Sequence, residues 1–384
     1  MCGIIGITSN ENVSASIIGA LKKLEYRGYD SAGIAIHESD KIFQRKVKGK
    51  LDNLVKSLEL EKSDGKTGIG HTRWATHGEP SEKNAHPHSS PYVSLVHNGI
   101  IENASDLKSL AELREYSFES ETDSEVITAL LSYYRKEGYT HIDCVKETIS
   151  KLEGSYALAI IFSDQKESIF GAKNGSPLVA GINDSGTSLG SDSIALSSLA
   201  EKVSYLEDGD IVVCNKDILE IFNTKGEKVE REFVDIGFDE TDISKGNFQH
   251  FMEKEIHEHP QAVGETFKQF IDHDKGLITV SDIELDFTSI SRIHLIACGT
   301  AYYACLVAKY YFEEYARVPV ECDMASEYRY RSPVLDKNAL CIFVSQSGET
   351  ADTKAAMDYS KSRGTNTLSI CLLYTSDAAD ERSS

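Results

Sequence analysis

The sequence predicts two domains, an α+β domain over roughly the first 235 residues and a parallel α/β domain after it. Short apolar segments follow one another between Gly154 and Phe233, and together with earlier strands they amount to two sheets. From about residue 290 strand and helix patterns alternate. Between the two parts the chain is acidic and polar. We therefore expect domains at residues 2–235 and 248–371, joined by a linker at residues 236–247.

Composition limits the classes of partner. The 384 residues carry 61 acidic and 40 basic side chains, a net charge of -21, which argues against binding to nucleic acid or to an anionic membrane. No apolar run reaches the roughly 20 residues that a membrane span needs, and the start lacks a signal-peptide pattern. We expect a soluble, cytoplasmic protein.

The cysteines indicate a reducing compartment. The chain has 8 cysteines without any CxxC spacing, and most of them lie within apolar segments. This usage is typical of reduced, buried thiols and not of a disulfide framework or a zinc site.

Met1-Cys2-Gly3-Ile4 is the first stretch that suggests chemistry. Once Met1 is removed, Cys2 carries both a thiol and a free α-amine, which titrates near ~8 and can act as its base. Cys2 is therefore a candidate N-terminal nucleophile. Ile4, Ile5 and Ile7 predict a buried strand that anchors it.

A helix is predicted over residues 13–25, because Ile17, Ile18, Leu21 and Leu24 share one face. A polar, glycine-containing loop follows at residues 26–33, and then a short strand at residues 34–36. Such a loop is either a plain connector or part of a site.

The stretch from Gly70 to His88 is dense in polar residues. Its four histidines have no strong ligand spacing and no cysteine nearby, so a zinc site is not expected. Arg73 has the fork that suits bidentate capture of a carboxylate. Trp74, the only tryptophan, suits either the core or a lid.

Residues 93–96 alternate like a strand and lead into His97-Asn98-Gly99. Asn-Gly first of all predicts a tight turn. A side-chain amide beside an unhindered backbone N–H also meets the needs of an oxyanion hole, which would stabilise acyl transfer from a thiolate.

Thr122-Asp123-Ser124-Glu125 has a capping-box pattern, and the apolar residues after it have helical spacing. A helix is expected to start here. Asp123 then either caps the helix or presents its carboxylate to a substrate ammonium.

Four strands are predicted in the rest of the first domain, at residues 156–162, 168–172, 178–181 and 210–214. In the second domain we expect a helix from about Phe248, strands at residues 293–298, 340–344 and 367–372, and helices at residues 302–315 and through Ala356 and Tyr359. Gly299-Thr300-Ala301 is read as a tight turn. Ligands of a parallel sheet bind beyond the carboxyl ends of its strands, where Ser345-Gln346-Ser347-Gly348-Glu349-Thr350 offers a phosphate cradle; an ordinary strand-to-helix loop is the alternative.

Several of these motifs resemble one family in order and spacing: residues 1–4, 26–33, 71–80, 84–88, 97–103 and 121–125. Together they are similar to the glutamine–fructose-6-phosphate aminotransferase (isomerising) family, the glucosamine-6-phosphate synthases. The resemblance extends to about residue 371.

The resemblance implies a class II glutamine amidotransferase domain with the αββα sandwich of N-terminal nucleophile hydrolases, followed by a sugar isomerase (SIS) domain. Cys2 would be the nucleophile, with Asn98 and Gly99 as the oxyanion hole. The resemblance places further residues around glutamine: Arg73 on its α-carboxylate, Asp123 on its α-ammonium, Trp74, Thr76 and His77 in a loop that closes over it, with Trp74 gating an ammonia tunnel, and Arg27 and Gly28 beside the nucleophile.

In the second domain the resemblance assigns the sugar phosphate to two loops, with Ser345, Gln346, Ser347 and Thr350 in one, and Gly299 and Thr300 in the other. Ala301 stands where the family commonly has serine, so one hydroxyl contact is absent. A second SIS subdomain is not expected here. Residues 372–384 do not resemble the family and are expected to be a non-native tail.

The activity that the resemblance implies is glutamine hydrolysis through a Cys2 thioester, with transfer of the ammonia to fructose 6-phosphate, no metal or other cofactor, and a homodimer as the assembly. We expect this chain to retain only the glutaminase half and part of the sugar-phosphate site. The alternatives are an amidophosphoribosyltransferase-like enzyme, which would need an acidic pair after a strand, and a sugar-phosphate-sensing protein without catalysis.

Overall fold

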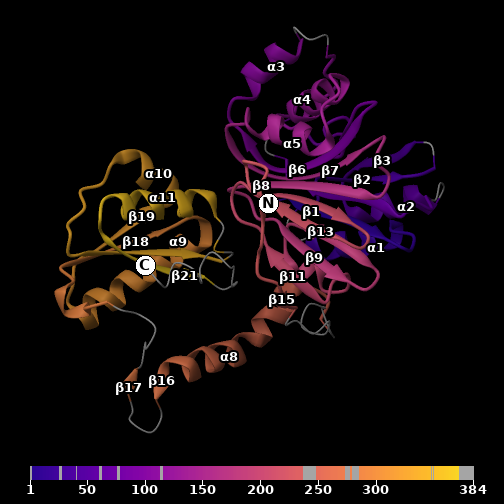
Figure 1. The fold of residues 1–384 in the computed structure, drawn as a ribbon. Helices are drawn as coiled ribbons and strands as arrows, with labels where there is room; N and C mark the ends of the chain where they lie inside the picture. The colour runs from indigo at the N-terminus through magenta and orange to yellow at the C-terminus, as the bar shows by residue number, and fades with distance from the viewer. Residues whose placement is uncertain are drawn as a thin grey trace. The chain divides into compact units, whose positions relative to one another are not determined.

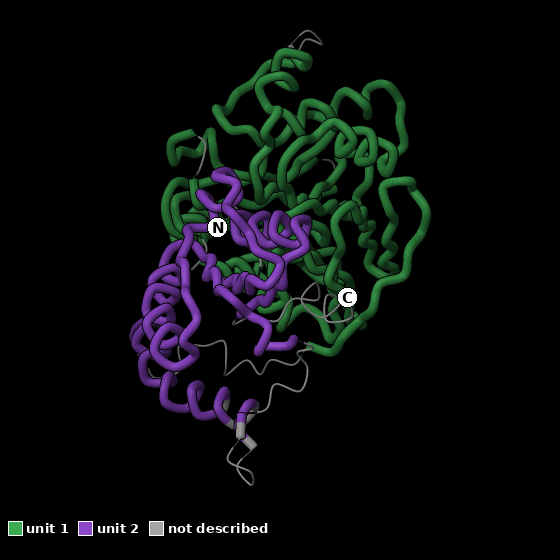
Figure 2. The backbone as a smooth tube through the Cα atoms, turned by 90° about the vertical axis from the view of Figure 1, so that its left-hand side faces the viewer, with its two compact units in different colours: residues 1–243 green, residues 244–384 purple. Residues whose placement is uncertain are grey.

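The computed structural model of the protein describes residues 2–25, 28–39, 41–59, 63–75, 78–112, 116–236, 248–272, 277–278, 285–346, 348 and 350–371. The chain forms two compact units, unit 1 at residues 1–243 and unit 2 at residues 244–384 (Figure 2). The boundary falls within the predicted linker, whose residues 237–247 lie outside the described ranges.

Unit 1 is built on two antiparallel sheets. The first has the order β15 (Val234–Asp235), β11 (Lys202–Tyr205), β9 (Val179–Asn183), β10 (Gly186–Gly190), β1 (Gly3–Ser9), β4 (Thr67–Arg73), β2 (Ser31–His37), β3 (Ile42–Lys48). The second has the order β14 (Lys228–Val229), β13 (Leu219–Phe222), β12 (Ile211–Asn215), β8 (Ser168–Asn174), β7 (Gly154–Phe162), β6 (Val93–Ile101), β5 (His88–Ser89).

Three apolar cores separate four layers. The middle core joins the inner faces of the two sheets, for example Ile4 and Ile69 from the first with Val96 and Ile161 from the second. The outer face of the first sheet packs on α1 (Ser14–Leu24), α2 (Leu51–Glu59) and α6 (Ser193–Leu196). The outer face of the second packs on α3 (Ala104–Glu112), α4 (Glu125–Lys136) and α5 (His141–Ile149) (Figure 1). The expected αββα sandwich is confirmed.

The strand that anchors Cys2 shows how the sequence produces these layers. Successive side chains of a strand point to opposite faces, so Ile4 enters the core between the sheets while Ile5 and Ile7 enter the core under α1. All three side chains are buried. At roughly 25 cal/mol per Å² of apolar surface, each contributes about 1.5–3 kcal/mol to holding this strand.

Unit 2 contains a four-stranded parallel sheet in the order β19 (Val320–Met324), β18 (Arg292–Ala297), β20 (Ala339–Ser345), β21 (Asn366–Cys371). One face packs on α9 (Gly299–Tyr311), and the other on α10 (Ala325–Arg331) and α11 (Ala351–Ser362). The parallel α/β arrangement is confirmed. Unit 2 also includes α8 (Phe251–Phe270), the pair β16 (Ile271–Asp272) and β17 (Leu277–Ile278), and short helical turns at Phe287–Ser289 and Phe312–Ala316.

Some expectations were wrong or incomplete. Gly299-Thr300-Ala301 is not a separate turn but the first turn of α9, because Gly299 has φ +60° and lets the helix start directly after β18. Two helices were expected in unit 1, and the described part of the unit has more. Neither β19 nor α10 was predicted. No helix in the described ranges is long and apolar enough to cross a membrane.

Candidate active site

The ends of three neighbouring strands bring distant residues together in unit 1. Gly3 of β1 pairs with Thr72 of β4, and Arg73 of β4 pairs with Ser31 of β2. Because these neighbours are antiparallel, the start of β1, the end of β4 and the start of β2 lie at the same edge of the sheet. Cys2, which precedes β1, is therefore next to the segment that follows β4.

The Cys2 thiol contacts the backbone of one residue on that segment, Trp74. Trp74 N–H donates to Cys2 Sγ at 3.2 Å, and the thiol lies 3.4 Å from Trp74 O. Burial raises the pKa of the Cys2 thiol, whereas the Trp74 N–H and the charge of Arg73 act to lower it. The sulfur is half-buried, and a backbone donor already points at it. Met1 lies outside the described residues.

Asn98 reaches the same place from the second sheet. Its Nδ2 donates to Cys2 O at 3.0 Å, which ties the two sheets together at the nucleophile. An amide nitrogen carries two hydrogens, so a second one can serve a substrate oxygen. The tight turn that Asn98-Gly99 suggested was wrong, because β6 runs through both residues, which pair with Ala157 and Tyr156 of β7.

Gly99 cannot be replaced by a larger residue without a shift of the backbone. It has φ +132°, and a Cβ added there would lie 2.0 Å from Ser155 O. The backbone of β6 thus passes close to β7 at this point, and Gly99 adds no side chain of its own beside its N–H. A bare N–H beside an amide side chain suits a developing oxyanion.

Arg73 and Asp123 lie near the nucleophile. Arg73 is buried at the end of β4, and burial lowers its pKa while the charges of Cys2, Asp123 and Asp30 raise it. Asp123 Oδ2 accepts from the Ile101 N–H at 2.9 Å, at the end of β6. The contact fixes the carboxylate at this edge, and Oδ1 accepts from Ser124 Oγ at 3.5 Å.

The capping box was wrong in detail, although α4 starts where it was expected, at Glu125. The Ser124 side chain makes no cap hydrogen bond. Glu125 instead accepts from Ser120 N at 2.6 Å and from Glu119 N at 3.0 Å. Asp123 is therefore not the cap of α4, and its side chain belongs to the nucleophile edge.

Trp74 lies in the segment that covers Cys2. The residue is 44% exposed, and its ring meets Tyr29 edge-on, with ring centroids 5.5 Å apart. Gly28 allows the two loops to touch, because a Cβ there would lie 2.6 Å from the Arg73 carbonyl carbon. Three of the predicted site residues, Arg27, Thr76 and His77, lie outside the described residues.

Two residues at this edge were not singled out from the sequence. Asp30 Oδ2 accepts from Ala75 N–H at 2.8 Å, and Asp30 N–H donates to Arg73 O at 3.0 Å, so Asp30 holds the segment that contacts Cys2. His71 Nε2 lies 3.0 Å from Asn98 Oδ1. These contacts depend on the pairing of β4 with β1 and β2 and on the packing of the two sheets against each other, so the sequence alone does not reveal them.

In unit 2 the two predicted phosphate loops follow adjacent parallel strands. Ala297 of β18 pairs with Val344 of β20, so Gly299 and Thr300 start α9 at the same edge where Ser345 and its loop lead into α11. The helices that follow, α9 and α11, cover opposite faces of the sheet. This is a topological switch point, the usual place for a ligand in such sheets.

The loop after β20 is organised around one hydroxyl. Ser345 Oγ lies 2.8 Å from Thr350 Oγ1 and accepts from Gly348 N–H at 3.2 Å. Gln346 and Thr300 are exposed, and Thr350 is the N-cap residue of α11. Ser347 lies outside the described residues. The arrangement gives polar groups at two helix N-termini, which favours an anion.

A further cluster in unit 2 does not suit a metal. Ligand atoms of His294, Glu321 and Asp323 lie within 4.8 Å of one another. However, Arg292 binds Glu321 at 2.8 Å and Arg331 binds Asp323 at 2.7 Å. These guanidinium groups neutralise both carboxylates, so we interpret the cluster as ion pairs.

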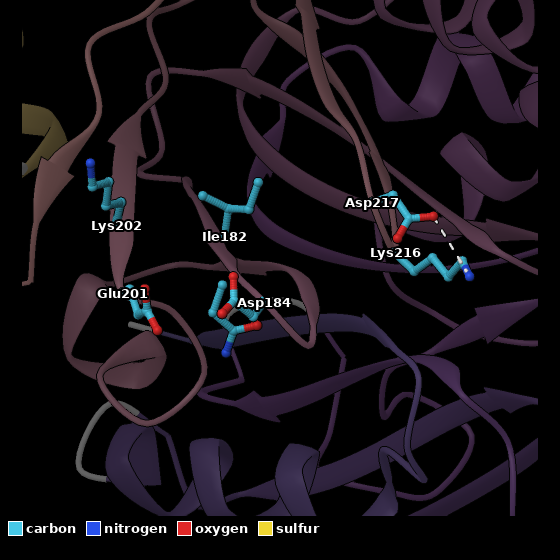
Figure 3. A pocket seen from close by; sticks show the side chains of 7 residues that line it. Ile182, Asp184, Glu201, Lys202, Lys216 and Asp217 are labelled. Atoms are coloured by element: carbon cyan, nitrogen blue, oxygen red, sulfur yellow. Dashed lines mark ion pairs between the residues drawn. The ribbon is translucent and has the colours of Figure 1, made fainter.

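A cavity in unit 1 lies away from Cys2. It has a volume of about 390 Å³ and is lined by Ile182, Asn183, Asp184, Glu201, Lys202, Lys216 and Asp217 (Figure 3). Ser9, at the end of β1, pairs with Gly186 beside it, so the cavity lies at the far end of β1 from Cys2, about 20 Å along the strand. Its charged lining includes the 3.6 Å Lys216–Asp217 ion pair and offers no nucleophile.

Two family models match the chain. A model described as a glutamine amidotransferase domain matches residues 71–198, and a model described as a SIS domain matches residues 286–383. The first match contains Arg73, Asn98 and Asp123, and the second contains both proposed phosphate loops.

Curated relatives match along almost the whole chain. The glutamine–fructose-6-phosphate aminotransferase (isomerizing) of Bradyrhizobium diazoefficiens is 46% identical over 382 residues, which is 99% of this chain and 63% of the relative. That of Mesorhizobium japonicum is 47% identical over 364 residues, 95% of this chain and 60% of the relative. The chain thus spans about three fifths of the length of these relatives.

A solved structure shares the fold at low identity. The glutamine phosphoribosylpyrophosphate amidotransferase from B. subtilis aligns with a TM-score of 0.52 at 18% identity, covering 96% of this chain and 81% of that chain. At that identity the likeness concerns the fold alone.

Proposed function

Because this chain is a homologue of the glutamine–fructose-6-phosphate aminotransferases, with a class II glutamine amidotransferase domain followed by one SIS domain, we propose that it hydrolyses glutamine through Cys2. The observation that carries the proposal is the meeting of Cys2 Sγ, the Trp74 peptide and the Asn98 amide at one edge of unit 1.

The reaction starts with the Cys2 thiolate. With Met1 removed, the α-amine of Cys2 accepts the thiol proton, and the sulfur attacks the side-chain amide carbon of glutamine. The carbonyl oxygen becomes an oxyanion, which Asn98 Nδ2–H and the Gly99 N–H stabilise. The C–N bond then breaks, ammonia leaves with the proton from the α-amine, and a γ-glutamyl thioester remains. Water hydrolyses the thioester and releases glutamate.

Arg73 and Asp123 select the amino acid. An arginine fork binds a carboxylate through two parallel N–H groups, so Arg73 suits the α-carboxylate of glutamine. Asp123, held by the Ile101 N–H, places a negative charge where the α-ammonium would lie. Their opposite charges at one edge match the α-carboxylate and the α-ammonium of an amino acid. An amide without these two groups would bind more weakly.

The second site is proposed for the phosphate of fructose 6-phosphate. The loop from Ser345 to Thr350 and the start of α9 offer hydroxyl and amide groups at a switch point of the sheet. In the complete enzyme the ammonia released at Cys2 would add to this sugar phosphate and give glucosamine 6-phosphate. We propose that this chain alone performs the glutaminase half, and that the assembly is a homodimer.

Two other functions fit less well. An amidophosphoribosyltransferase shares the glutaminase fold, but the SIS match at residues 286–383 favours a sugar phosphate over a phosphoribosyl diphosphate. A sensing protein without catalysis would have no need for Cys2 and Asn98 in contact.

The direct test is a glutaminase assay on the full chain and on Cys2→Ala. We expect slow release of glutamate and ammonia by the parent chain, and a loss of at least about 10³-fold in the variant, because the proposed thioester forms on the Cys2 sulfur. Cys144→Ala is a matched control, since Cys144 is a buried cysteine between α5 and the second sheet. Equal turnover by Cys2→Ala would contradict the proposal.

A further inference from the structure

Four histidines of unit 1 have no role in the mechanism above. His71, His86, His88 and His97, here called the histidine quartet, are all buried. The ring of His86 lies in the middle, with centroids 4.2 Å from His71, 4.7 Å from His88 and 6.4 Å from His97. The quartet lies directly behind Asn98, because His97 precedes it in β6 and His71 contacts its side chain.

The contacts of His71 determine where its proton is. Nε2 lies 3.1 Å from His97 O and 3.0 Å from Asn98 Oδ1. A backbone carbonyl can only accept, so Nε2 must carry the hydrogen. Nδ1 of His71 is buried and has no hydrogen-bond partner among the described residues. The ring is therefore the neutral tautomer with its hydrogen on Nε2.

This tautomer decides the orientation of the Asn98 amide. The oxygen and nitrogen of a carboxamide are nearly the same size, so sterics alone would allow either to face His71. A donor at His71 Nε2 requires the oxygen there, which turns Nδ2 to the Cys2 side. The other end agrees independently, because Nδ2 faces Cys2 O at 3.0 Å, and that atom also accepts only.

The rest of the quartet holds the donor in place. His97 N–H donates to His86 Nδ1 at 3.2 Å, so His86 fixes the backbone of the residue whose carbonyl His71 binds. His88 Nε2 lies 2.9 Å from Thr122 Oγ1 and supports His86 from the other side. Burial, with the nearby charge of Arg73, lowers the pKa of His71 to about 3, so its protonation does not change near neutral pH.

We propose that His71 is the positioning residue of the oxyanion hole, with its Nε2–H locking the Asn98 amide so that Nδ2 points at the nucleophile. This inference rests on the proposed glutaminase function. It adds that the orientation of the amide is set by a histidine that touches neither substrate nor sulfur.

The variants His71→Leu and His71→Gln test it in the full chain. Leucine removes the donor, whereas the glutamine amide nitrogen can take the place of Nε2. The matched control is His37→Leu, a buried histidine at the far end of β2 whose Nε2 lies 2.7 Å from Phe162 O. Circular dichroism and urea unfolding establish that each variant is folded.

The expected pattern is specific to positioning. In His71→Leu, kcat for glutamine hydrolysis should fall by about 10–100-fold, which is less than the fall expected when an oxyanion donor is removed altogether. KM should stay within about threefold of the parent value. His71→Gln should recover most of kcat, and His37→Leu should keep it. The rate at which iodoacetamide alkylates Cys2, followed by mass spectrometry of the Cys2 peptide, should stay within about twofold of the parent rate. That reaction builds no oxyanion. An unchanged kcat, or a fall of kcat and alkylation together, would overturn the proposal.

A second measurement on the parent chain does not depend on activity. With 15N-labelled histidine, NMR should show one ring protonated on Nε2 that does not titrate between pH 5 and 8 and whose signal is lost in His71→Gln. A His71 signal protonated on Nδ1 would refute the orientation argument even if the chain hydrolyses glutamine. If the parent chain shows this tautomer but no hydrolysis, the proposed function fails while the orientation holds.

Discussion

In unit 1 the proposed reactive groups are tied to one another, whereas in unit 2 Ser345 is bonded within its own loop and other proposed ligand groups stand exposed. Cys2, Trp74 and Asn98 are linked by hydrogen bonds of 3.0–3.4 Å, with buried histidines behind them. Thr300 and Gln346 are exposed. A site that must stabilise a transient oxyanion benefits from donors fixed beforehand, while a phosphate can organise exposed donors as it binds.

The largest expected effect is on the stability of unit 1 in acid. Burial lowers the pKa of His71, His86, His88 and His97, whereas a histidine in the unfolded chain titrates near ~6.5. Above that pH both states are neutral and nothing changes. Below it the unfolded state binds more protons, so the free energy of unfolding falls by up to about 1.4 kcal/mol per histidine for each pH unit.

Urea unfolding at pH 7.5 and 5.5 measures this effect. Trp74, the only tryptophan, lies in unit 1, so its fluorescence reports that unit. In the described part of unit 2 a single buried histidine, His294, has a lowered pKa. The free energy of unfolding of unit 2 should therefore fall less steeply with pH than that of unit 1. Equal stability of unit 1 at the two pH values would contradict a neutral, buried quartet.

The next effect concerns the oxyanion hole. Asn98→Ala should lower kcat for glutamine hydrolysis by about 10²–10³-fold, since one fixed donor is lost from the transition state. KM should change little. Asn103→Ala is a matched control, because Asn103 follows β6 and its side chain binds Lys151 O on the surface. A fall in kcat of less than about threefold for Asn98→Ala would show that this amide does not face the oxyanion.

A smaller effect is expected where the two loops touch. Gly28→Ala would put a Cβ 2.6 Å from the Arg73 carbonyl carbon, and such overpacking typically costs about 1–3 kcal/mol. We expect lower stability and lower glutaminase activity together. Gly19→Ala is the control, because Gly19 is an exposed position of α1 where a Cβ meets nothing within 4 Å, and the helix should gain about 0.4–1 kcal/mol. Full activity of Gly28→Ala would argue against a tight fit.

The smallest effect is expected in unit 2. Ser345→Ala removes the hydroxyl that binds Thr350 and Gly348, so affinity for fructose 6-phosphate should fall by roughly tenfold, in line with about 1–1.5 kcal/mol for one hydrogen bond. Calorimetric titration measures it, with Ser362→Ala at the end of α11 as control. Glutamine hydrolysis should be unchanged. A loss of glutaminase activity in Ser345→Ala would break the separation of the two sites.

The fold was predictable where apolar patterns are long. β1, β7 and β20 are continuous buried strands, and each was expected within one or two residues of its bounds. β10, Gly-Thr-Ser-Leu-Gly, has little strand propensity and exists because it pairs with β1 and β9. β19, Val-Glu-Cys-Asp-Met, has acidic residues that ion pairs with Arg292 and Arg331 stabilise. Neither partner set can be read from local sequence.

The site was predictable only in part. Cys2, Arg73, Asn98 and Asp123 came from residue chemistry and a resemblance, and the structure brings them to one edge. Of the two alternatives for Asn98-Gly99, the tight turn was wrong, because pairing with β7 outweighs the local turn preference. His71 was missed because its contact with Asn98 joins two sheets, and no spacing within one segment can show which side chains face each other across a sandwich.

The most direct test of the account is to trap the intermediate. The full chain is mixed with glutamine, quenched in acid within seconds, and its N-terminal peptide is examined by mass spectrometry. The account predicts a peptide that begins at Cys2, without Met1, and carries one γ-glutamyl group bound as a thioester on that residue. A reactive chain whose N-terminal peptide retains Met1, or whose γ-glutamyl group lies on another residue, would contradict it.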